Sequence, residues 1–358
     1  MKKLYSSHTV LIFLAFFLSG CNNLSCDKRD DLTISNHLQP ISEDNIFKTD
    51  GYYNWCTSII RGEDGKFHLF YSRWVKEYSF TAWLTHSEIA HAVADSPGGP
   101  WTYRETVIEG RGKEQWDAIT AHNPKIKYFD GKYYLYYVST NLGDVDYTME
   151  DLIETARTGY SHPNWKILRP NQRTGVAVSS SLWGPWERMD HPLIEPSGPI
   201  TTLTVNPAID RRGDGKYYLV VKGDKPNETR FIRNQAVAIS DSPAGPFKMQ
   251  TKPVIDNLDT EDMSIWYDTG RERFYGVFHA HTFIGMVTSP DGANWEKAED
   301  YVLTPKEIQR QDGSILMPDR LERPFIFLDE NQPEVLSLAV KKDDESYCIF
   351  IPITQGNP

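Results

Sequence analysis

Short runs of alternating apolar and polar residues come in pairs along this chain. Three of these pairs are joined by Asp-Gly-Lys, at residues 64–66, 130–132 and 214–216. Glycine accepts the positive φ of a tight turn, so Asp-Gly between two such runs predicts a β-hairpin. Two further pairs keep the pattern without that turn, at residues 264–278 and 324–338. The chain therefore contains five copies of one hairpin.

A second unit, a Ser-Pro-x-Gly-Pro-aromatic turn, alternates with the hairpins. It occupies residues 95–101, 181–186 and 241–247, and in weaker form residues 289–295, each time after a further β-rich run. Two hairpins per repeat make a four-stranded sheet, and repeated sheets of this kind are typical of β-propellers. We therefore predict an all-β fold, a five-bladed β-propeller of four-stranded antiparallel blades around a central channel. The alternative is a β-sandwich, which has no reason to repeat two motifs in strict alternation.

The first 20 residues follow a different pattern. Lys2 and Lys3 precede an apolar run at residues 10–17 that is too short for a comfortable membrane span. Residues 18–21, Leu-Ser-Gly-Cys, resemble the bacterial lipoprotein cleavage box. The resemblance implies a signal peptide at residues 1–20, a lipid anchor on Cys21, and export to the outer membrane or cell surface. An ordinary secretory signal is the alternative. We expect a polar, flexible tether at residues 21–40 and one propeller domain at residues 41–358.

Composition narrows the function. The net charge of −11 argues against nucleic acid as a partner. Aromatic residues make up 13% of the chain, and exposed rings could stack on sugars. After Cys21 the chain has only Cys26, Cys56 and Cys348, which is neither a disulfide framework nor a zinc-binding pattern. No cofactor is expected, a divalent metal in the channel is left open, and the oligomeric state is not predicted.

The geometry of a blade predicts where polar side chains meet. First strands start at one rim of the channel, second strands end there, and third strands start there. Aligning the repeats puts these residues at the first-strand starts: Cys56, Asn123, Asn206, Asp262 and Arg323, preceded by Trp55, His122, Val205, Glu261 and Glu322. The other strand ends and the loop into the second blade add these: Arg73, Trp74, His86, Glu88, Trp116, Asp117, Thr140, Asn141, Lys222, Asp224, His279 and His281.

A ring of carboxylates with His, Arg and Trp suits the cleavage of glycosidic bonds. That reaction needs one acid to protonate the leaving oxygen and a second group to activate water or attack the anomeric carbon. Crowding carboxylates in a partly dry channel raises the pKa of one of them. The candidate catalytic residues are Asp262, Glu261, Glu322, Asp117 and His279. The candidate substrate-binding residues are Arg73, Trp74, Glu88, Trp116, His122, Asn123, Asn206, Lys222, His281 and Arg323.

Each candidate also has a structural interpretation. Glu261 and Asp262 could cap a turn, and Glu322 with Arg323 could form a structural ion pair. His279 and His281 lie two residues apart, so both face the channel or neither does. Asp117 could be a solvated turn residue, and Cys56 could be a small buried residue.

The repeats resemble the five-bladed glycoside hydrolases of families 43, 32, 68, 117 and 130. The resemblance rests on residues 123–126 and 130–135, the matching run in the third blade, and the Gly-Pro turns, and it covers about residues 54–340. In family 43 the general base is an Asp at the start of the first blade, where this chain has Cys56. The family 43 acid is a Glu early in the third blade, where residues 203–207 contain none. Residues 261–267 and 321–324 are more similar to family 117, in which acidic residues and a His share the work.

Two functions from different classes follow. The first is a lipid-anchored glycoside hydrolase, exo-acting and inverting, that cleaves a plant or algal oligosaccharide by carboxylate and His acid-base catalysis. The second is a non-catalytic glycan-binding lipoprotein of the cell surface. Many buried carboxylates favour the enzyme, because their desolvation is costly in a protein that only binds. A phosphorylase is a third possibility if Arg73, Lys222 and Arg323 bind phosphate.

Overall fold

The computed structural model describes residues 31–354. The predicted signal peptide, the lipidation site Cys21 and the cysteine at position 26 lie outside the described residues. Within the described residues no helix is long and apolar enough to cross a membrane.

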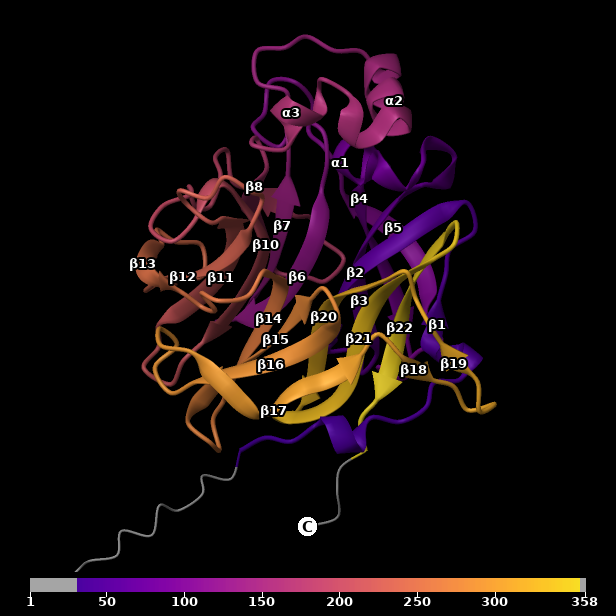
Figure 1. Ribbon diagram of the computed structural model, residues 1–358, viewed down its shortest axis with the longest axis vertical. Helices are drawn as coiled ribbons and strands as arrows, with labels where there is room; N and C mark the ends of the chain where they lie inside the picture. The colour runs from indigo at the N-terminus through magenta and orange to yellow at the C-terminus, as the bar shows by residue number, and fades with distance from the viewer. Residues whose placement is uncertain (1–30, 355–358) are drawn as a thin grey trace, which may run out of the picture. The chain divides into compact units, whose positions relative to one another are not determined.

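The described residues form five four-stranded antiparallel sheets, and the predicted five-bladed propeller is confirmed (Figure 1). The first sheet consists of β2 (Tyr52–Arg61), β3 (Phe67–Val75), β4 (Glu88–Ala94) and β5 (Thr102–Ile108). The second consists of β6 (His122–Phe129), β7 (Lys132–Ser139), β8 (Arg173–Ser179) and β9 (Glu187–Arg188). The third consists of β10 (Thr201–Arg211), β11 (Tyr217–Asp224), β12 (Arg233–Ser240) and β13 (Lys248–Pro253). The fourth consists of β14 (Thr260–Asp268), β15 (Arg273–Ala280), β16 (Phe283–Ser289) and β17 (Glu296–Pro305).

The fifth sheet combines both ends of the described chain. Its strands are β20 (Arg320–Asp329), β21 (Gln332–Lys342), β22 (Glu345–Pro352) and the short β1 (Ile46–Phe47). Strand β1 pairs antiparallel with β22, with Ile46 opposite Ile349. The last blade therefore takes its outer strand from the beginning of the fold, which closes the ring of blades. A hairpin of β18 (Ile308–Gln309) and β19 (Ile315–Leu316) lies between the fourth and fifth sheets in the sequence.

The first strands of the five blades surround the channel. Strands β2, β6, β10, β14 and β20 each contact the first strands of two other blades, in a closed circle. Each of them also carries a register shift against its second strand, at the same place in the repeat. At that place one residue has a positive φ: Cys56 (42°), Asn123 (53°), Asn206 (56°), Asp262 (66°) and Arg323 (58°). These are the five residues that the sequence alignment put at the first-strand starts.

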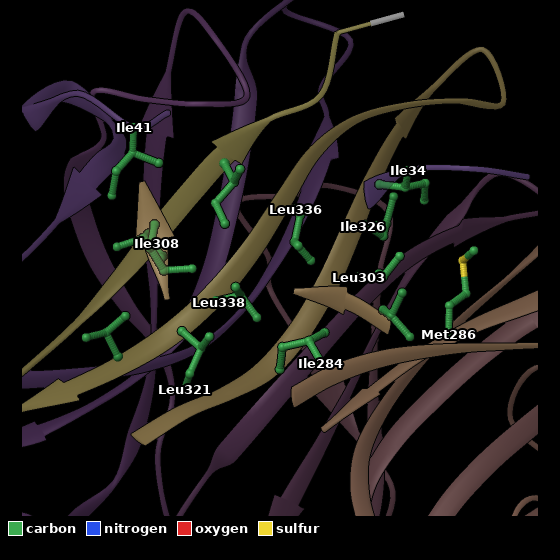
Figure 2. Packing of buried hydrophobic residues seen from close by; sticks show 14 of the residues in the cluster. Ile34, Ile41, Ile284, Met286, Leu303, Ile308, Leu321, Ile326, Leu336 and Leu338 are labelled. Atoms are coloured by element: carbon green, nitrogen blue, oxygen red, sulfur yellow. The ribbon is translucent and has the colours of Figure 1, made fainter. Parts of the chain in front are cut away.

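Apolar side chains pack between neighbouring blades. One cluster joins the fourth and fifth blades, with Ile284 and Met286 on β16 against Ile326 and Leu336 on β20 and β21 (Figure 2). The same cluster includes Ile34 from the segment before the first blade (Figure 2).

The folded part of the chain begins earlier than the sequence predicted. Residues 31–40 were expected to belong to a flexible tether, but Leu32 and Ile34 are buried. The backbone N–H groups of Ile34 and Ser35 both donate to Asp300 Oδ2, at 2.6 Å. The short helices η1 (Ser35–His37) and η2 (Glu43–Asn45) follow. The corrected boundary is Leu32, because the apolar residues of this segment complete the packing between two blades.

Two insertions cover one end of the channel. The first lies between β3 and β4 and contains η3 (Lys76–Tyr78), η4 (Phe80–Ala82) and α1 (Trp83–His86). The second lies between β7 and β8 and contains α2 (Met149–Thr158), η5 (Gly159–Ser161) and α3 (Trp165–Leu168). Thr81 Oγ1 donates to the carbonyl of Ala156 at 2.6 Å, so the two insertions are tied together. They form a helical cap, at the top of Figure 1.

Substitutions of Asn206 test how much its positive-φ backbone and its hydrogen bonds contribute to the stability of the fold. It accepts a hydrogen bond from Asn123 Nδ2 and donates one to Asp262 Oδ1, both at 2.6 Å. Asn206→Ala should lower the free energy of unfolding by about 2–4 kcal/mol, because it leaves buried partners unsatisfied and because Ala tolerates a positive φ less well than Asn. Asn206→Gly relieves only the strain, so it should be about 1 kcal/mol less destabilising.

Urea unfolding measures these differences. Asn227→Ala is the matched control, because Asn227 has a similar φ of 62° but lies exposed in a loop. Equal stability of Asn206→Ala and the parent protein would show that the hydrogen bonds at this position do not hold the blades together.

Candidate functional site

The end of the channel beneath the cap opens into a cavity of about 660 Å³. Its floor comes from the bulged first strands, its walls from second and third strands, and its roof from the cap. The predicted site residues that line it are Trp74, His122, Asn123, Asn206, Lys222, Glu261, His279, His281, Glu322 and Arg323. The sequence alignment therefore found most of the floor of this cavity.

The bulge explains why so many neighbours in the sequence reach one cavity. In a regular strand, consecutive side chains point to opposite faces of the sheet. Here His122 and Asn123 both line the cavity, and so do Glu322 and Arg323. A residue with positive φ turns the backbone locally, and a bulge redirects the side chains beside it. The second, third and fifth blades thus each contribute a pair of adjacent side chains to the cavity instead of one.

Four of the five bulge residues are directly bonded to one another. Asn123 donates to Asn206, Asn206 donates to Asp262, and Arg323 donates to the same Asp262 Oδ1. The fifth, Cys56, has its sulfur 4.0 Å from Nζ of the buried Lys125. The prediction that the first-strand starts meet at one channel is confirmed. Asp262 accepts the last hydrogen bonds of this series, from Asn206 and from Arg323.

Glu261 is held as a carboxylate by two cations. Its Oε2 accepts from Lys222 Nζ at 2.8 Å and its Oε1 accepts from Arg233 NH1 at 2.5 Å. Burial alone would raise the pKa of Glu261, but the charges of Lys222, Arg233 and Arg323 lower it well below its usual range. With both oxygens in ion pairs, Glu261 is suited to fixing these cations rather than to transferring a proton.

Asp262 differs from its neighbour in the sequence. Burial and the nearby charge of Glu261 raise the pKa of Asp262, and this effect outweighs the opposing charge of Arg323. Its Oδ2 has no hydrogen-bond partner among the described residues and lies 3.6 Å from Nδ1 of His279. Two adjacent carboxyl groups whose environments move their pKa values apart are a common arrangement in acid-base catalysis.

His279 and Glu322 both bring polar atoms without a hydrogen-bond partner to the cavity. Both ring nitrogens of His279 are buried and lack a hydrogen-bond partner within the described part of the chain. The side chain of Glu322 forms no hydrogen bond within residues 31–354, and its nearest cation is Arg320 NH1 at 3.9 Å. A ligand in the cavity could therefore reach an imidazole and a carboxylate that the protein itself leaves unsatisfied.

His122 has a different environment. Its ring stacks on Trp83, with centroids 5.5 Å apart, and its Nδ1 is 2.6 Å from Ser87 Oγ. Burial and then the charge of Arg323 hold the pKa of His122 well below its usual value. A neutral ring fixed in this way can bind a hydroxyl group, but it lacks the second ring proton that an imidazolium acid would donate.

Several residues of the site were not found from the sequence. The cap contributes aromatic rings: Phe80, Trp83, Tyr160 and Trp165. The second insertion also contributes Arg169, and the third blade contributes Phe231 and Arg233. The centroid of the Phe231 ring lies 3.9 Å from the guanidinium of Arg169 and 5.7 Å from that of Arg233. The length of the insertion between the second and third strands of the second blade was the available signal. Where an inserted segment folds back cannot be derived from strand alignment.

Other predicted residues lie away from the cavity. Arg73 Nε donates to Glu88 Oε1 at 2.6 Å, and the Arg73 guanidinium is packed on Tyr103 within the first blade. Neither Arg73 nor Glu88 lines the cavity. Consecutive side chains of a strand point to opposite faces of the sheet, so Arg73 points away from the cavity that Trp74 lines.

Asp117 and Trp116 belong to the packing of the second blade. Asp117 is fully buried and accepts from Arg111 Nε at 2.6 Å and from Tyr137 Oη at 2.8 Å. Trp116 donates to the carbonyl of Met189. The catalytic role expected for Asp117 is corrected, because its loop folds against the blade and its carboxylate is occupied by structural partners.

One group of side chains has the composition of a metal site. Glu261, Asp262 and His279 each offer an atom within 4.8 Å of the others. However, both oxygens of Glu261 are already in ion pairs, and Lys222, Arg233 and Arg323 surround the group. Three cations make a poor environment for a divalent ion, so these residues fit proton transfer better than metal binding.

Comparison with known proteins supports the fold. No family model matches the sequence, and no curated protein matches it. Among solved structures the chain is similar to Zg3597, a family 117 glycoside hydrolase of the marine bacterium Zobellia galactanivorans, with a TM-score of 0.62 and 17% identity over 89% of this chain and 90% of that one. The chain therefore shares its five-bladed propeller fold with this enzyme.

Two other structures show the range of this fold. An endo-arabinase from Bacteroides thetaiotaomicron has a TM-score of 0.55 and 12% identity, over 88% of this chain and 99% of that one. A family 43 β-xylosidase/α-arabinofuranosidase from a compost metagenome, solved with xylotriose, has a TM-score of 0.55 and 15% identity, over 89% of this chain and 94% of that one. Identities this low establish the fold alone, so the reaction is argued below from the site.

The ion pairs of Glu261 predict a pH-dependent loss of stability. Because its pKa is lowered on folding from 4.5, Glu261 stabilises the protein above about pH 4.5, and this contribution declines as the pH falls toward the folded-state pKa. Glu261→Gln should lower the free energy of unfolding by about 3 kcal/mol at pH 7, because it leaves buried cations without their partner. The difference from the parent should shrink steadily below pH 4.5.

Urea titrations at pH 7 and pH 3.5 measure this difference. The control is Glu43→Gln, since Glu43 is exposed and lies 3.3 Å from a surface arginine. A difference between Glu261→Gln and the parent that is the same at both pH values would contradict the ionised state assigned to Glu261.

Proposed function

We propose that this protein is a glycoside hydrolase that cleaves an oligosaccharide in the cavity beneath the cap. The observation that carries the proposal is that Glu322 and His279 line one cavity, with Oδ2 of the buried Asp262 3.6 Å from His279 Nδ1. The aromatic residues of the cap offer apolar faces for sugar rings. The likeness in fold to glycoside hydrolases supports the same function.

In the proposed reaction His279 donates a proton to the leaving glycosidic oxygen. Asp262, with its raised pKa and its Oδ2 3.6 Å from His279 Nδ1, is the adjacent group that shares this proton. Glu322 acts as the carboxylate that activates water for attack on the anomeric carbon, which would invert its configuration. Glu261 keeps Lys222 and Arg233 in position, and His122 and Asn123 contact the sugar hydroxyl groups.

The cap favours exo-action. A glycan chain can pass through an open groove, but helices α1 and α3 stand over one side of this cavity through Trp83 and Trp165, whose rings are 5.6 Å apart. A closed side would limit binding to the end of a chain. Plant and algal oligosaccharides remain the proposed substrates.

Substitution of the two cavity-facing groups tests catalysis. Glu322→Gln and His279→Gln should each lower kcat by about 10²–10⁴-fold, with KM changed far less, because each variant keeps its size but loses proton transfer. Product analysis on a panel of oligosaccharides identifies a substrate, and steady-state kinetics on it gives both constants. His191→Gln and Glu43→Gln are surface controls of the same chemical type.

The alternative is a glycan-binding protein without activity. Cys56 at the start of the first blade, and the engagement of both oxygens of Glu261, are the observations that favour it. Calorimetry separates the two functions. If an oligosaccharide binds the parent protein and is never cleaved, the proposed hydrolase activity is wrong and the glycan-binding function is supported instead.

We also propose that the protein is a lipoprotein of the bacterial cell envelope, anchored through Cys21. The basis is the sequence of residues 1–21 alone. Cys21→Ser should move the protein from the membrane fraction to the soluble fraction while the activity of the propeller is unchanged, since Cys21 precedes the strands of the propeller in the sequence. Fractionation followed by immunoblotting measures this. Retention of Cys21→Ser in washed membranes would contradict the lipid anchor.

A further inference from the structure

The cavity has a charge opposite to that of the whole chain. The chain carries a net charge of −11, yet six cationic side chains line the cavity and only two carboxylates do. The six are Arg169, Lys222, Arg233, Lys306, Arg320 and Arg323. A concave surface of one charge in a protein of the opposite charge attracts ligands of complementary charge.

Four of these cations are neutralised by acidic side chains. Arg169 makes two hydrogen bonds to the carboxylate of Asp224. Lys222 and Arg233 pair with Glu261, and Arg233 also pairs with Asp259. Arg323 pairs with Asp262, as described above. These four have structural partners and contribute little net charge to a ligand.

The other two, Arg320 and Lys306, are not neutralised. The nearest carboxylate oxygen to Arg320 is that of Glu322, at 3.9 Å, which is too long for a hydrogen bond. The guanidinium of Arg320 instead lies 5.4 Å from the ring centroid of Phe80 in the cap. Lys306 forms no ion pair within residues 31–354, and its strand-end position directly after β17 brings it to the same cavity.

Their position relative to the proposed reaction centre limits what they can bind. Arg320 is the first residue of β20 and lies three residues before Arg323, which corresponds to about 10 Å along an extended strand. Its side chain nevertheless reaches the reaction centre, because its NH1 lies 3.9 Å from Oε1 of Glu322. A group bound by Arg320 and Lys306 therefore lies beside the carboxylate proposed to activate water, where a substituent of the bound sugar ring can reach it.

We propose that Arg320 and Lys306 form a subsite for an anionic substituent of the sugar, a carboxylate or a sulfate ester, so that the substrate is an acidic oligosaccharide. This inference rests on the proposed function for the identity of the ligand as a glycan. The fork of donors on Arg320 matches two oxygens of either group, and Lys306 supplies a second positive charge. Phe80 offers an apolar face beside the charged group.

Binding experiments test this subsite without requiring activity. The probes are matched pairs that differ only in charge: oligogalacturonates with their methyl esters, and sulfated galactan oligosaccharides with their desulfated forms. Calorimetry with the parent protein should show tighter binding of the charged member of at least one pair, by about tenfold or more. The pair that shows the difference distinguishes a carboxylate from a sulfate.

Variants then locate the effect. Arg320→Gln and Lys306→Gln should each weaken binding of the charged member about tenfold and leave the neutral member unchanged. Added salt should weaken binding of the charged member to the parent more than to the double variant. Arg310→Gln is the matched control, because Arg310 pairs with Glu43 outside this cavity.

Four outcomes would overturn the proposal. Equal binding of charged and neutral members to the parent would remove the subsite, and so would the absence of binding by every probe. A charge preference that survives in the double variant would place the subsite elsewhere. Cleavage of a neutral oligosaccharide that depends on inorganic phosphate, and is lost in Arg320→Gln, would instead assign these cations to phosphate. If binding depends on charge but no probe is cleaved, the proposed anionic subsite is supported while the proposed hydrolase activity is wrong.

Discussion

The left-handed residue in each first strand is the constraint on which the site depends. It interrupts the alternation of a regular strand, so that each blade can direct two consecutive side chains toward the channel. Asn and Asp tolerate positive φ better than other residues with a side chain, and three of the five positions carry them: Asn123, Asn206 and Asp262. Their amide and carboxylate groups then bond to one another across blade boundaries. The same backbone feature therefore ties the blades together and supplies the floor of the cavity.

Arg323 and Cys56 occupy the equivalent positions in the fifth and first blades, although neither residue type favours a positive φ. A positive φ is unfavourable for an arginine, and strained residues persist only where the surrounding structure compensates for them. For Arg323 the compensation is its ion pair with the buried Asp262, an interaction that a neutral residue could not make. Cys56 has no comparable partner beyond Lys125, and burial raises the pKa of its thiol. Its thiol is therefore a neutral, buried group, which agrees with the structural interpretation of this residue.

The sequence predicted the blades well because repetition adds information to each weak strand signal. Five hairpins of the same length fixed the alignment, and with it the five bulge residues. The closing strand β1 could not be found in this way, since it is two residues long and belongs to no repeat. The packing of Leu32 and Ile34 was missed for a related reason. Their neighbours are polar, so composition alone indicated a tether, whereas two apolar side chains were enough to fill the space between blades.

The site was predicted only where it is built from the repeat. Residues on the floor, such as Glu261 and Glu322, followed from the alignment, but the cap and Arg233 did not. Asp117 was misassigned because the sequence does not show which way a loop folds. This loop folds against the second blade, where Asp117 accepts hydrogen bonds from Arg111 and Tyr137.

Ion pairing, rather than residue type, separates the possible roles of the carboxylates. Glu261 and Asp262 are adjacent and both buried, but they have different partners. The carboxylate of Glu261 pairs with two cations, whereas Asp262 accepts from one cation, Arg323, and from the amide of Asn206. Burial and the charge of Glu261 in turn raise the pKa of Asp262. A residue that cannot itself transfer a proton thus determines which neighbour can. The number of acidic residues at the channel mouth was therefore enough to suggest acid-base chemistry from the sequence. Distinguishing the roles of Glu261 and Asp262 required the positions of Lys222 and Arg233.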